Sequence, residues 1–192
     1  MSQISDSELQ SIIENVVTRS MAAPEQRGMP CAEAAKKSIA IGSDHGGFDL
    51  KEILKSDLIS ADHQVIDCGT FSKESCDYPD IALAVAQKVS DGSVCRGIII
   101  DGAGIGSCMV ANKVPGVRAA LCYDYATAVN SREHNNANVL TLGAGLIGIN
   151  LAKQIVQTWL GTEFAGGRHA KRVDKITMVE NQYFKRRQYG SR

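Results

Sequence analysis

From residue 38 onward, short apolar runs alternate with segments in which apolar residues recur at helical spacing. Apolar runs of four to six residues bounded by polar or glycine-rich segments are typical of buried strands. Five such runs occur, at Ser38–Gly42, Gln64–Asp67, Gly97–Asp101, Arg118–Cys122 and Val139–Leu142. Helical spacing is found at Phe48–Ser60, Ile81–Ser90, Ser107–Lys113, Tyr125–His134 and Ile147–Leu160, and in a last stretch after Gly166 and Gly167. Alternating strands and helices predict an α/β fold, here a three-layer Rossmann-like domain with a five-stranded parallel sheet over residues 38–192.

The first 21 residues carry a separate amphipathic pattern. Ser5 and Glu8 match a capping box at a helix start. One apolar stripe follows at helical spacing, formed by Leu9, Ile12, Ile13, Val16 and Val17. Residues 22–37 contain two prolines and a glycine and are predicted to be a linker. Because an isolated helix of this length is marginal in water, we expect residues 1–21 to dock on another surface.

The composition limits which binding partners and which cellular compartment we expect for the protein. The 21 basic and 21 acidic residues cancel, which argues against nucleic acid or an anionic membrane as a partner. No apolar run approaches the roughly 20 residues that span a bilayer, and no secretory signal precedes the domain. The six cysteines show no CxxC pair or zinc-like spacing. We therefore expect reduced thiols in a cytoplasmic protein.

Polar and glycine-rich segments follow two of the predicted strands. These segments are Ser43–Gly47 and Asp101–Gly106. Parallel α/β sheets bind ligands beyond the carboxyl ends of their strands, so Asp44 and His45 are candidate site residues. Gly143–Gly148 matches GxGxxG, but it follows the last strand, which disfavours a dinucleotide site. Backbone amides that bind an anion or an oxyanion are the better interpretation, and no residues have metal-ligand spacing.

Three further residues suggest phosphate and proton chemistry. Arg168 and Arg172 are four residues apart, so on a helix they lie on one face, where two guanidinium groups suit a phosphate dianion. A solvated basic helix is the alternative. His134 follows a predicted helix and can be a proton shuttle or a capping residue.

Seven segments, in collinear order, together resemble the ribose-5-phosphate isomerase B and galactose-6-phosphate isomerase family. The segments are Gly42–Phe48, Asp67–Thr70, Asp77–Asp80, Gly102–Gly106, Ala111–Ala119, Arg132–Val139 and Gly166–Val173. The resemblance implies metal-independent and cofactor-free interconversion of aldose and ketose phosphates through a cis-enediol. Ribose 5-phosphate and ribulose 5-phosphate are the expected pair.

The resemblance also assigns roles. Asp44 and His45 would line the site and Tyr78 would contact the sugar. Amides for the developing oxyanion would come from the loop of Gly102, Gly104 and Gly106.

The remaining roles fall in the second half of the chain. His134 would assist ring opening, Asn135 would hold the substrate, and Arg168 and Arg172 would grip the phosphate. Family members are dimers with shared sites, so we expect a homodimer or tetramer in which His134 and the arginines serve the neighbouring site.

Several positions depart from the family pattern. Asp101 stands where the commonest members have a cysteine base, and Ser107 stands where another branch has a glutamate base; we expect Ser107 to bind substrate. Ala103 replaces a threonine or serine, and Gly145 replaces a third phosphate-binding arginine. The loop resembles that of the A subunit of galactose-6-phosphate isomerase, whose sites are shared with a different subunit.

Three interpretations of the base follow from these departures. Asp101 can replace the cysteine, or the thiolate of Cys108 can act after a shift of the loop. Alternatively, the chain works as half of a hetero-oligomer or as a non-catalytic sugar-phosphate binder.

The N-terminal segment resembles the encapsulation peptides that deliver enzymes into bacterial microcompartments. This resemblance implies that residues 4–21 dock on a shell or cargo protein and that the protein resides inside a microcompartment of the cytoplasm. Packing on the enzyme's own dimer is an alternative. Membrane-surface binding is a weaker one, because Arg19 is the only basic residue of the helix.

Overall fold

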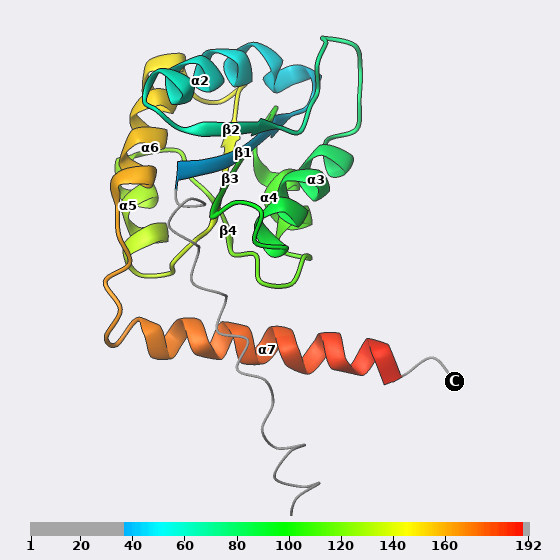
Figure 1. The fold of residues 1–192 in the computed structure, drawn as a ribbon, viewed down its shortest axis with the longest axis vertical. Coiled ribbons are helices and arrows are strands. Elements are labelled where there is room, and N and C mark those ends of the chain that lie inside the picture. Colours follow the sequence, from blue (N-terminus) through cyan, green and yellow to red (C-terminus); the bar gives the residue numbers. More distant parts are fainter. Residues whose placement is uncertain (1–36, 190–192) are drawn as a thin grey trace, which may run out of the picture. The chain divides into compact units, whose positions relative to one another are not determined.

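Five parallel strands form one sheet within residues 37–189, which are the residues that the computed structural model describes (Figure 1). The strands are β1 (Ser38–Ser43), β2 (Gln64–Asp67), β3 (Arg96–Asp101), β4 (Ala119–Leu121) and β5 (Val139–Gly143). Their order across the sheet is β2-β1-β3-β5-β4. The chain therefore leaves β1 toward one side for β2 and crosses to the other side for β3, which makes the boundary between β1 and β3 a topological switch point.

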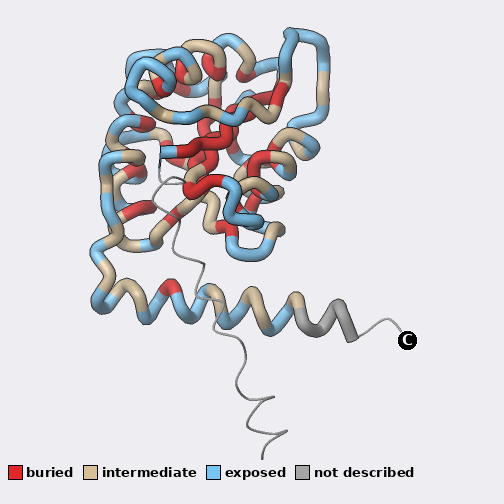
Figure 2. Tube along the Cα trace, in the orientation of Figure 1, coloured by how far each residue is buried: buried red, intermediate tan, exposed pale blue. Residues whose placement is uncertain are grey.

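Helices cover both faces of the sheet. One apolar core lies under α2 (Phe48–Ser60), α5 (Tyr125–Glu133) and α6 (Ile149–Gly161). The other lies under α3 (Tyr78–Ser90) and α4 (Ile105–Ala111). Figure 2 shows the buried residues concentrated along the central strands. The predicted three-layer α/β architecture with a five-stranded parallel sheet is confirmed.

The last helix, α7 (Ala170–Tyr189), follows the paired glycines at 166 and 167 as predicted. Val173 is buried against the domain. The carboxylate of Glu180 accepts hydrogen bonds of 3.0 and 3.1 Å from the Gly116 amide. These contacts join α7 to the loop between α4 and β4.

Most predicted element bounds agree with the structure to within two residues. β2 and α2 match the predicted ranges, whereas α3 begins three residues earlier than predicted, at Tyr78. The reason is Pro79, which the first helical turn accommodates because its missing N–H is not needed there. The predicted N-terminal helix and almost all of the predicted linker lie outside the described residues.

The cysteines differ from expectation at one position. Cys68, Cys76, Cys108 and Cys122 are free thiols, as expected. Cys95 is disulfide-bonded, so the prediction of reduced thiols is wrong for this residue. Sequence spacing carries no signal for such a bond, because folding brings distant cysteines together.

Within residues 37–189, no helix is both long enough and apolar enough to cross a bilayer.

Candidate active site

Two buried carboxylates lie at the switch point between β1 and β3. Asp44 follows β1 and Asp101 ends β3; they are 9% and 4% exposed. The two strand ends are joined directly, because the Asp44 amide donates to the Ile100 carbonyl oxygen at 3.1 Å. Two buried acidic residues therefore lie at the strand ends that flank the crevice where open α/β sheets bind ligands.

The Asp101 carboxylate is held by four donors from its own loop. Oδ1 accepts from the Ala103 amide at 2.8 Å and from the Gly104 amide. Oδ2 accepts from the Ser107 amide at 3.1 Å and from the Ser107 hydroxyl at 2.5 Å. The side chain thus organises the turn from β3 into α4.

One of the loop amides predicted to serve an oxyanion, that of Gly104, already has an acceptor in this structure. The Ala103, Gly104 and Ser107 amides all donate to Asp101. The amides of Ile105 and Gly106, at the start of α4, donate to no acceptor within the part of the chain that the structure describes. These two amides are the ones available to a developing oxyanion.

The loop glycines allow three segments to approach closely. Gly104 has a φ of 76°, and a Cβ there would lie 2.9 Å from the Leu142 carbonyl carbon. A Cβ on Gly106 would lie 2.5 Å from the Tyr78 ring, so Tyr78 packs directly on the loop. Tyr78 therefore lies against the loop after β3, and its predicted contact with the sugar stays a prediction.

The GxGxxG segment has a packing role. The Gly145 amide donates to the Gly102 carbonyl oxygen at 3.0 Å, and a Cβ on Gly143 would lie 2.7 Å from Ala103. These glycines let the loop after β5 lie against the loop after β3.

Asp44 caps the N-terminus of a short 3₁₀ helix, η2 (His45–Gly47), which begins at His45. Asp44 Oδ1 accepts from the Gly47 amide at 3.0 Å. The His45 ring is exposed, and its Nδ1 lies 3.3 Å from both the amide nitrogen and the carbonyl oxygen of Cys76. His45 is therefore available at the mouth of the crevice.

Cys108 points away from the loop that it follows. Its Sγ lies 3.5 Å from the Ala119 carbonyl oxygen, toward β4. Burial, more than any other cause, raises the pKa of the Cys108 thiol, and the negative charge of Asp101 adds to this effect. A thiolate is disfavoured at this position.

Sequence reasoning missed Tyr123. This residue follows β4, and its hydroxyl donates to the Ala103 carbonyl oxygen at 2.6 Å. The sequence did contain a signal that could have identified it, because Tyr123 is an aromatic residue directly after a predicted strand.

The other predicted site residues form a second cluster. The rings of His134 and His169 stack with centroids 4.1 Å apart. Arg168 Nε lies 3.4 Å from His169 Nε2, and Arg172 Nη1 donates to the Arg168 carbonyl oxygen at 3.0 Å. Desolvation, then His134 and the two arginine charges, lower the pKa of His169. Sequence reasoning missed His169, although its neighbour Arg168 was identified.

Asn130 orients two members of this cluster. Its Nδ2 lies 2.8 Å from His134 Nδ1, and the Asn135 side chain donates to the Asn130 carbonyl oxygen at 3.2 Å. The second cluster therefore brings together four residues that the sequence singled out, His134, Asn135, Arg168 and Arg172, and adds His169.

The two clusters lie at opposite ends of the parallel strands. We call the side where the strands end the carboxyl edge of the sheet and the side where they begin the amino edge. Asp44 follows β1 and Asp101 is the last residue of β3, so both lie at the carboxyl ends of the strands. His134 lies between the end of α5 and the start of β5, which places it at the amino edge. Arg168 follows α6, which also returns the chain to the amino edge.

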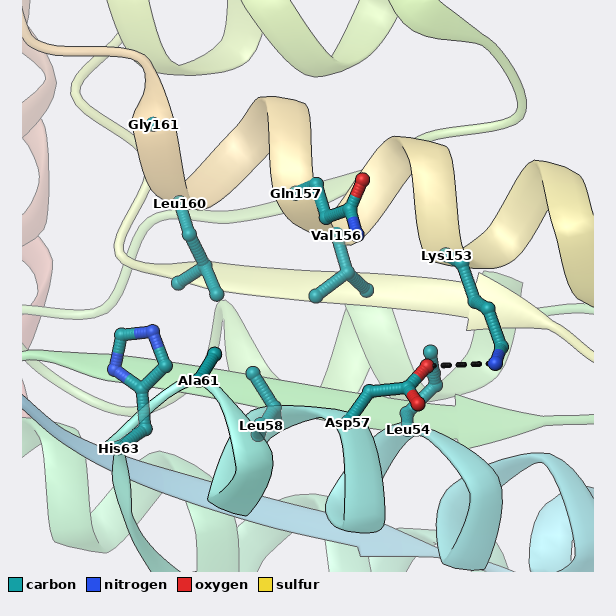
Figure 3. A pocket seen from close by; sticks show the side chains of 10 residues that line it. All are labelled: Leu54, Asp57, Leu58, Ala61, His63, Lys153, Val156, Gln157, Leu160 and Gly161. Carbon is teal, nitrogen blue, oxygen red and sulfur yellow. Dashed lines mark ion pairs between the residues drawn. The ribbon is translucent and has the colours of Figure 1, made fainter.

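A separate groove lies between α2 and α6, on the opposite face of the sheet from α4 (Figure 3). Its volume is about 330 Å³, and an Asp57–Lys153 ion pair of 2.8 Å crosses it. It is lined by Leu54, Asp57, Leu58, Ala61, His63, Lys153, Val156, Gln157, Leu160 and Gly161. None of the predicted site residues is among them.

The model of the Ribose/Galactose Isomerase family matches residues 39–176.

Individual proteins are similar to this chain over nearly the whole of their own lengths. Ribose-5-phosphate isomerase B of Escherichia coli is 46% identical over 76% of this chain and 98% of its own length. D-erythrulose-4-phosphate isomerase of Pectobacterium atrosepticum is 45% identical over 76% of this chain and 96% of its own length.

Solved structures show the same fold. Ribose-5-phosphate isomerase B of Clostridium thermocellum superposes with a TM-score of 0.75 and 52% identity, covering 76% of this chain and 99% of that one. The Mycoplasma genitalium enzyme with bound ribulose-5-phosphate gives a TM-score of 0.73 and 43% identity, covering 75% and 96%.

Proposed function

This chain belongs to the ribose/galactose isomerase family, and from that premise we propose that it is a sugar-phosphate isomerase of the ribose-5-phosphate isomerase B type. Its proposed substrate pair is ribose 5-phosphate and ribulose 5-phosphate. The observation that carries the proposal is the pair of buried carboxylates, Asp44 and Asp101, at the β1–β3 switch point of a sheet that the family match spans.

The proposed reaction moves one proton between two carbons. Asp101 takes the proton from C2 of the open-chain aldose and returns it to C1, while the hydroxyl proton at O2 passes to O1. Electron density accumulates on the substrate oxygens in the enediolate. The Ile105 and Gly106 amides, which lack another acceptor in the described chain, are placed to stabilise this charge.

The amino-edge cluster supplies the remaining functions. His134 assists opening of the sugar ring, with its Nδ1 side held by Asn130 at 2.8 Å. Asn135 holds the substrate, and Arg168 and Arg172 bind its phosphate as guanidinium donors.

We infer that each active site combines the carboxyl edge of one chain with the amino edge of another. Apolar side chains stand exposed around the Asp101 loop: Met109 is 63% exposed and Leu146 62%. Exposed apolar groups rimming a polar site favour a protein contact. A second copy contacting this edge would cover them and deliver His134 and Arg168. The assembly would be a homodimer or a tetramer.

One observation favours a second candidate function. All four acceptor positions of the Asp101 carboxylate are occupied by its own loop, and Cys108 faces β4. If Asp101 stays in this state, the chain requires a different subunit that carries the base, as in a galactose-6-phosphate-type hetero-oligomer, or only binds sugar phosphates.

A turnover assay of the purified chain separates the two candidates. Ribose 5-phosphate, allose 6-phosphate and galactose 6-phosphate are assayed in parallel. Turnover of ribose 5-phosphate by the chain alone supports the first function. Binding without turnover of any of the three supports the second.

We also propose that residues 4–21 form a docking peptide that directs the enzyme into a bacterial microcompartment. The family match begins at residue 39, so the amphipathic segment lies outside the part shared with the isomerases. Its apolar stripe would bind a groove on a shell or cargo protein. Fusing residues 1–37 to a fluorescent protein tests this: co-purification with shells supports the proposal, and a diffuse, shell-free protein contradicts it.

A further inference from the structure

We propose that the cavity bounded by β4, α5 and α7 is a second phosphate-binding site, in which the Arg118 guanidinium group binds the dianion of inorganic phosphate or of a phosphomonoester. Its charged residue differs from the pair proposed to bind the substrate's phosphate, Arg168 and Arg172. The inference does not depend on the proposed isomerase reaction, because the binding is measured without turnover.

This cavity has the size and the lining of a small-molecule site. Its volume is about 610 Å³, and it lies beside β4, an edge strand of the sheet. The lining combines alanine side chains and one isoleucine with the amide side chains of Asn112, Asn130 and Asn135. Arg118 is the charged residue among those that line it. Apolar walls with a few polar groups are typical of sites for small ligands.

Most donors of the Arg118 side chain have no acceptor in the described chain. Arg118 comes directly before β4, and its Nε donates to the Asn136 carbonyl oxygen at 2.9 Å. Within residues 37–189, neither Nη atom of Arg118 donates a hydrogen bond, and the side chain forms no ion pair. Since a guanidinium group presents its donors as a planar fork that matches phosphate oxygens, the two Nη atoms are available to an anion in the cavity.

The acidic residue that acts on Arg118 is already engaged elsewhere. Glu180 of α7 attracts the Arg118 charge, but both of its carboxylate oxygens accept from the Gly116 amide, at 3.0 and 3.1 Å. Burial still lowers the pKa of Arg118, so the attraction of Glu180 does not offset the desolvation. Buried charges are stabilised by pairing, and a bound phosphate group would supply the missing partner.

A second positive charge lies behind Arg118. Arg132 is 1% exposed, and its Nη1 donates to the Asn136 side-chain oxygen at 3.0 Å and to the Ala137 carbonyl oxygen at 2.6 Å. Asn136 therefore binds both arginines, and Ala137 lines the cavity. Burial and the charge of Arg96 lower the pKa of Arg132 to about 10, and the charge of Arg118 adds to this effect. Arg132 is too deeply buried to contact a ligand, but its charge makes this wall of the cavity more positive.

The charge at this wall favours a doubly charged oxyanion. One dianion offsets the charges of both Arg118 and Arg132, whereas a single carboxylate offsets only one of them. Ala126 of α5 and Ile176 of α7 line the same cavity and offer apolar contacts to the carbon chain of a phosphomonoester. Inorganic phosphate and phosphomonoesters share the chemistry that Arg118 recognises, so the experiment tests both.

The test follows backbone amide signals by NMR while inorganic phosphate is added at constant ionic strength. In wild type we expect saturable shifts at Ala126 and Ile176, which line the cavity. Arg118→Gln should weaken this binding by about tenfold or more, as loss of charge-assisted hydrogen bonds implies. Arg118→Lys, which keeps the charge and loses the fork, should fall between the two.

Lys113→Gln is the matched control for the loss of one positive charge. Lys113 is exposed in the same α4–β4 loop and does not line the cavity, so its removal should leave the affinity within about twofold. A parallel titration with glycerol 2-phosphate distinguishes the two sources. Tighter binding of glycerol 2-phosphate identifies an organic phosphate as the ligand, and tighter binding of inorganic phosphate identifies the free ion.

Three outcomes would overturn the inference: no saturable shift at the cavity amides with either probe, an unchanged affinity in Arg118→Gln, or an equal loss in Lys113→Gln. Loss of the cavity shifts in Arg168→Ala would also overturn it, by showing one phosphate site where we infer two. Thermal unfolding identifies a misfolded variant, and Arg118→Lys then carries the comparison. Shifts at the cavity without any at Arg168 and His169 would contradict the proposed substrate-phosphate cluster and leave this inference standing.

Discussion

The imidazole ring of His134 stacks on that of His169, with ring planes inclined by only 2° and centroids 4.1 Å apart. Arg168 and Arg172 lie beside this pair, so the amino edge presents two guanidinium groups next to a histidine whose pKa is lowered. A positively charged cluster of this kind is suited to an anion.

We predict that phosphate binding raises the pKa of His169. The free chain has this pKa below the ordinary value, because of desolvation and the positive charges nearby. A bound phosphate dianion would offset those charges and favour the imidazolium. NMR titration of the histidine signals with and without inorganic phosphate measures the shift, and His63, in the separate α2–α6 groove, serves as the reference. An equal change at both histidines, or none at His169, would contradict phosphate binding at this cluster.

A second prediction concerns the shared site. Asp101→Asn and Arg168→Ala should each be inactive alone, and a mixed assembly of the two should recover activity. In a mixed dimer, one site carries both substitutions and the other carries neither. Random pairing then yields about a quarter of wild-type activity, measured after co-expression or after unfolding and refolding together.

The alternative arrangement gives a different result. If Asp101 and Arg168 served the same site within one chain, every site in a mixed dimer would carry one substitution. No activity would then be recovered, and the proposal of shared sites would be wrong.

The third prediction concerns Cys108. Cys108→Ala should retain kcat within about twofold, because burial keeps the thiol protonated and its sulfur faces β4. The thiol should also react slowly with iodoacetamide at neutral pH. Loss of activity in Cys108→Ala, with a normal melting temperature, would identify the thiolate as the base.

Acid stability provides a fourth prediction. Lys51 is fully buried in α2, and its Nζ lies 2.9 and 2.8 Å from the two carboxylate oxygens of Asp67 and 2.8 Å from the Thr70 carbonyl oxygen. Desolvation raises the pKa of Asp67, but hydrogen bonds from Lys51 and Lys55 outweigh it, so the net pKa is lowered. A carboxyl whose pKa is lowered by folding contributes stability above its unfolded pKa of about 4 and loses it as pH falls further.

Asp67→Asn should therefore unfold more easily at pH 7, by about 2 kcal/mol, and should lose less stability than wild type below pH of about 4. Urea titrations at several pH values measure both effects. Asp62→Asn is the matched control, because the Asp62–Lys37 pair is exposed and its removal should leave the urea midpoint unchanged. Parallel acid slopes in wild type and Asp67→Asn would exclude the proposed linkage.

Much of the fold was predictable because the hydrophobic pattern of each segment matches the way that segment is buried in the sheet. Central strands such as β3 are buried on both faces and read as continuous apolar runs. The early start of α3 at Tyr78 was missed, since Ile81 is the first residue of the recurring apolar pattern. The separation of Asp101 and His134 to opposite edges follows from the order of strands and helices alone.

Side-chain partners in the site were less predictable. Sequence placed Ser107 in the loop, but which atom its hydroxyl faces depends on the turn formed around Gly104. Stacking of His169 on His134 joins residues 35 positions apart, and no periodic pattern encodes that contact. The Cys95 disulfide was missed for the same reason.

The most direct test of the central claim is the turnover of ribose 5-phosphate by the purified wild-type chain and by its Asp101→Asn variant. The account predicts turnover by wild type and a kcat lower by about 10²–10⁴-fold in Asp101→Asn, with a similar KM, as expected for loss of a general base. Equal kcat values in the two proteins would show that Asp101 is not the base, and no turnover by wild type would contradict the assignment of an isomerase that works alone.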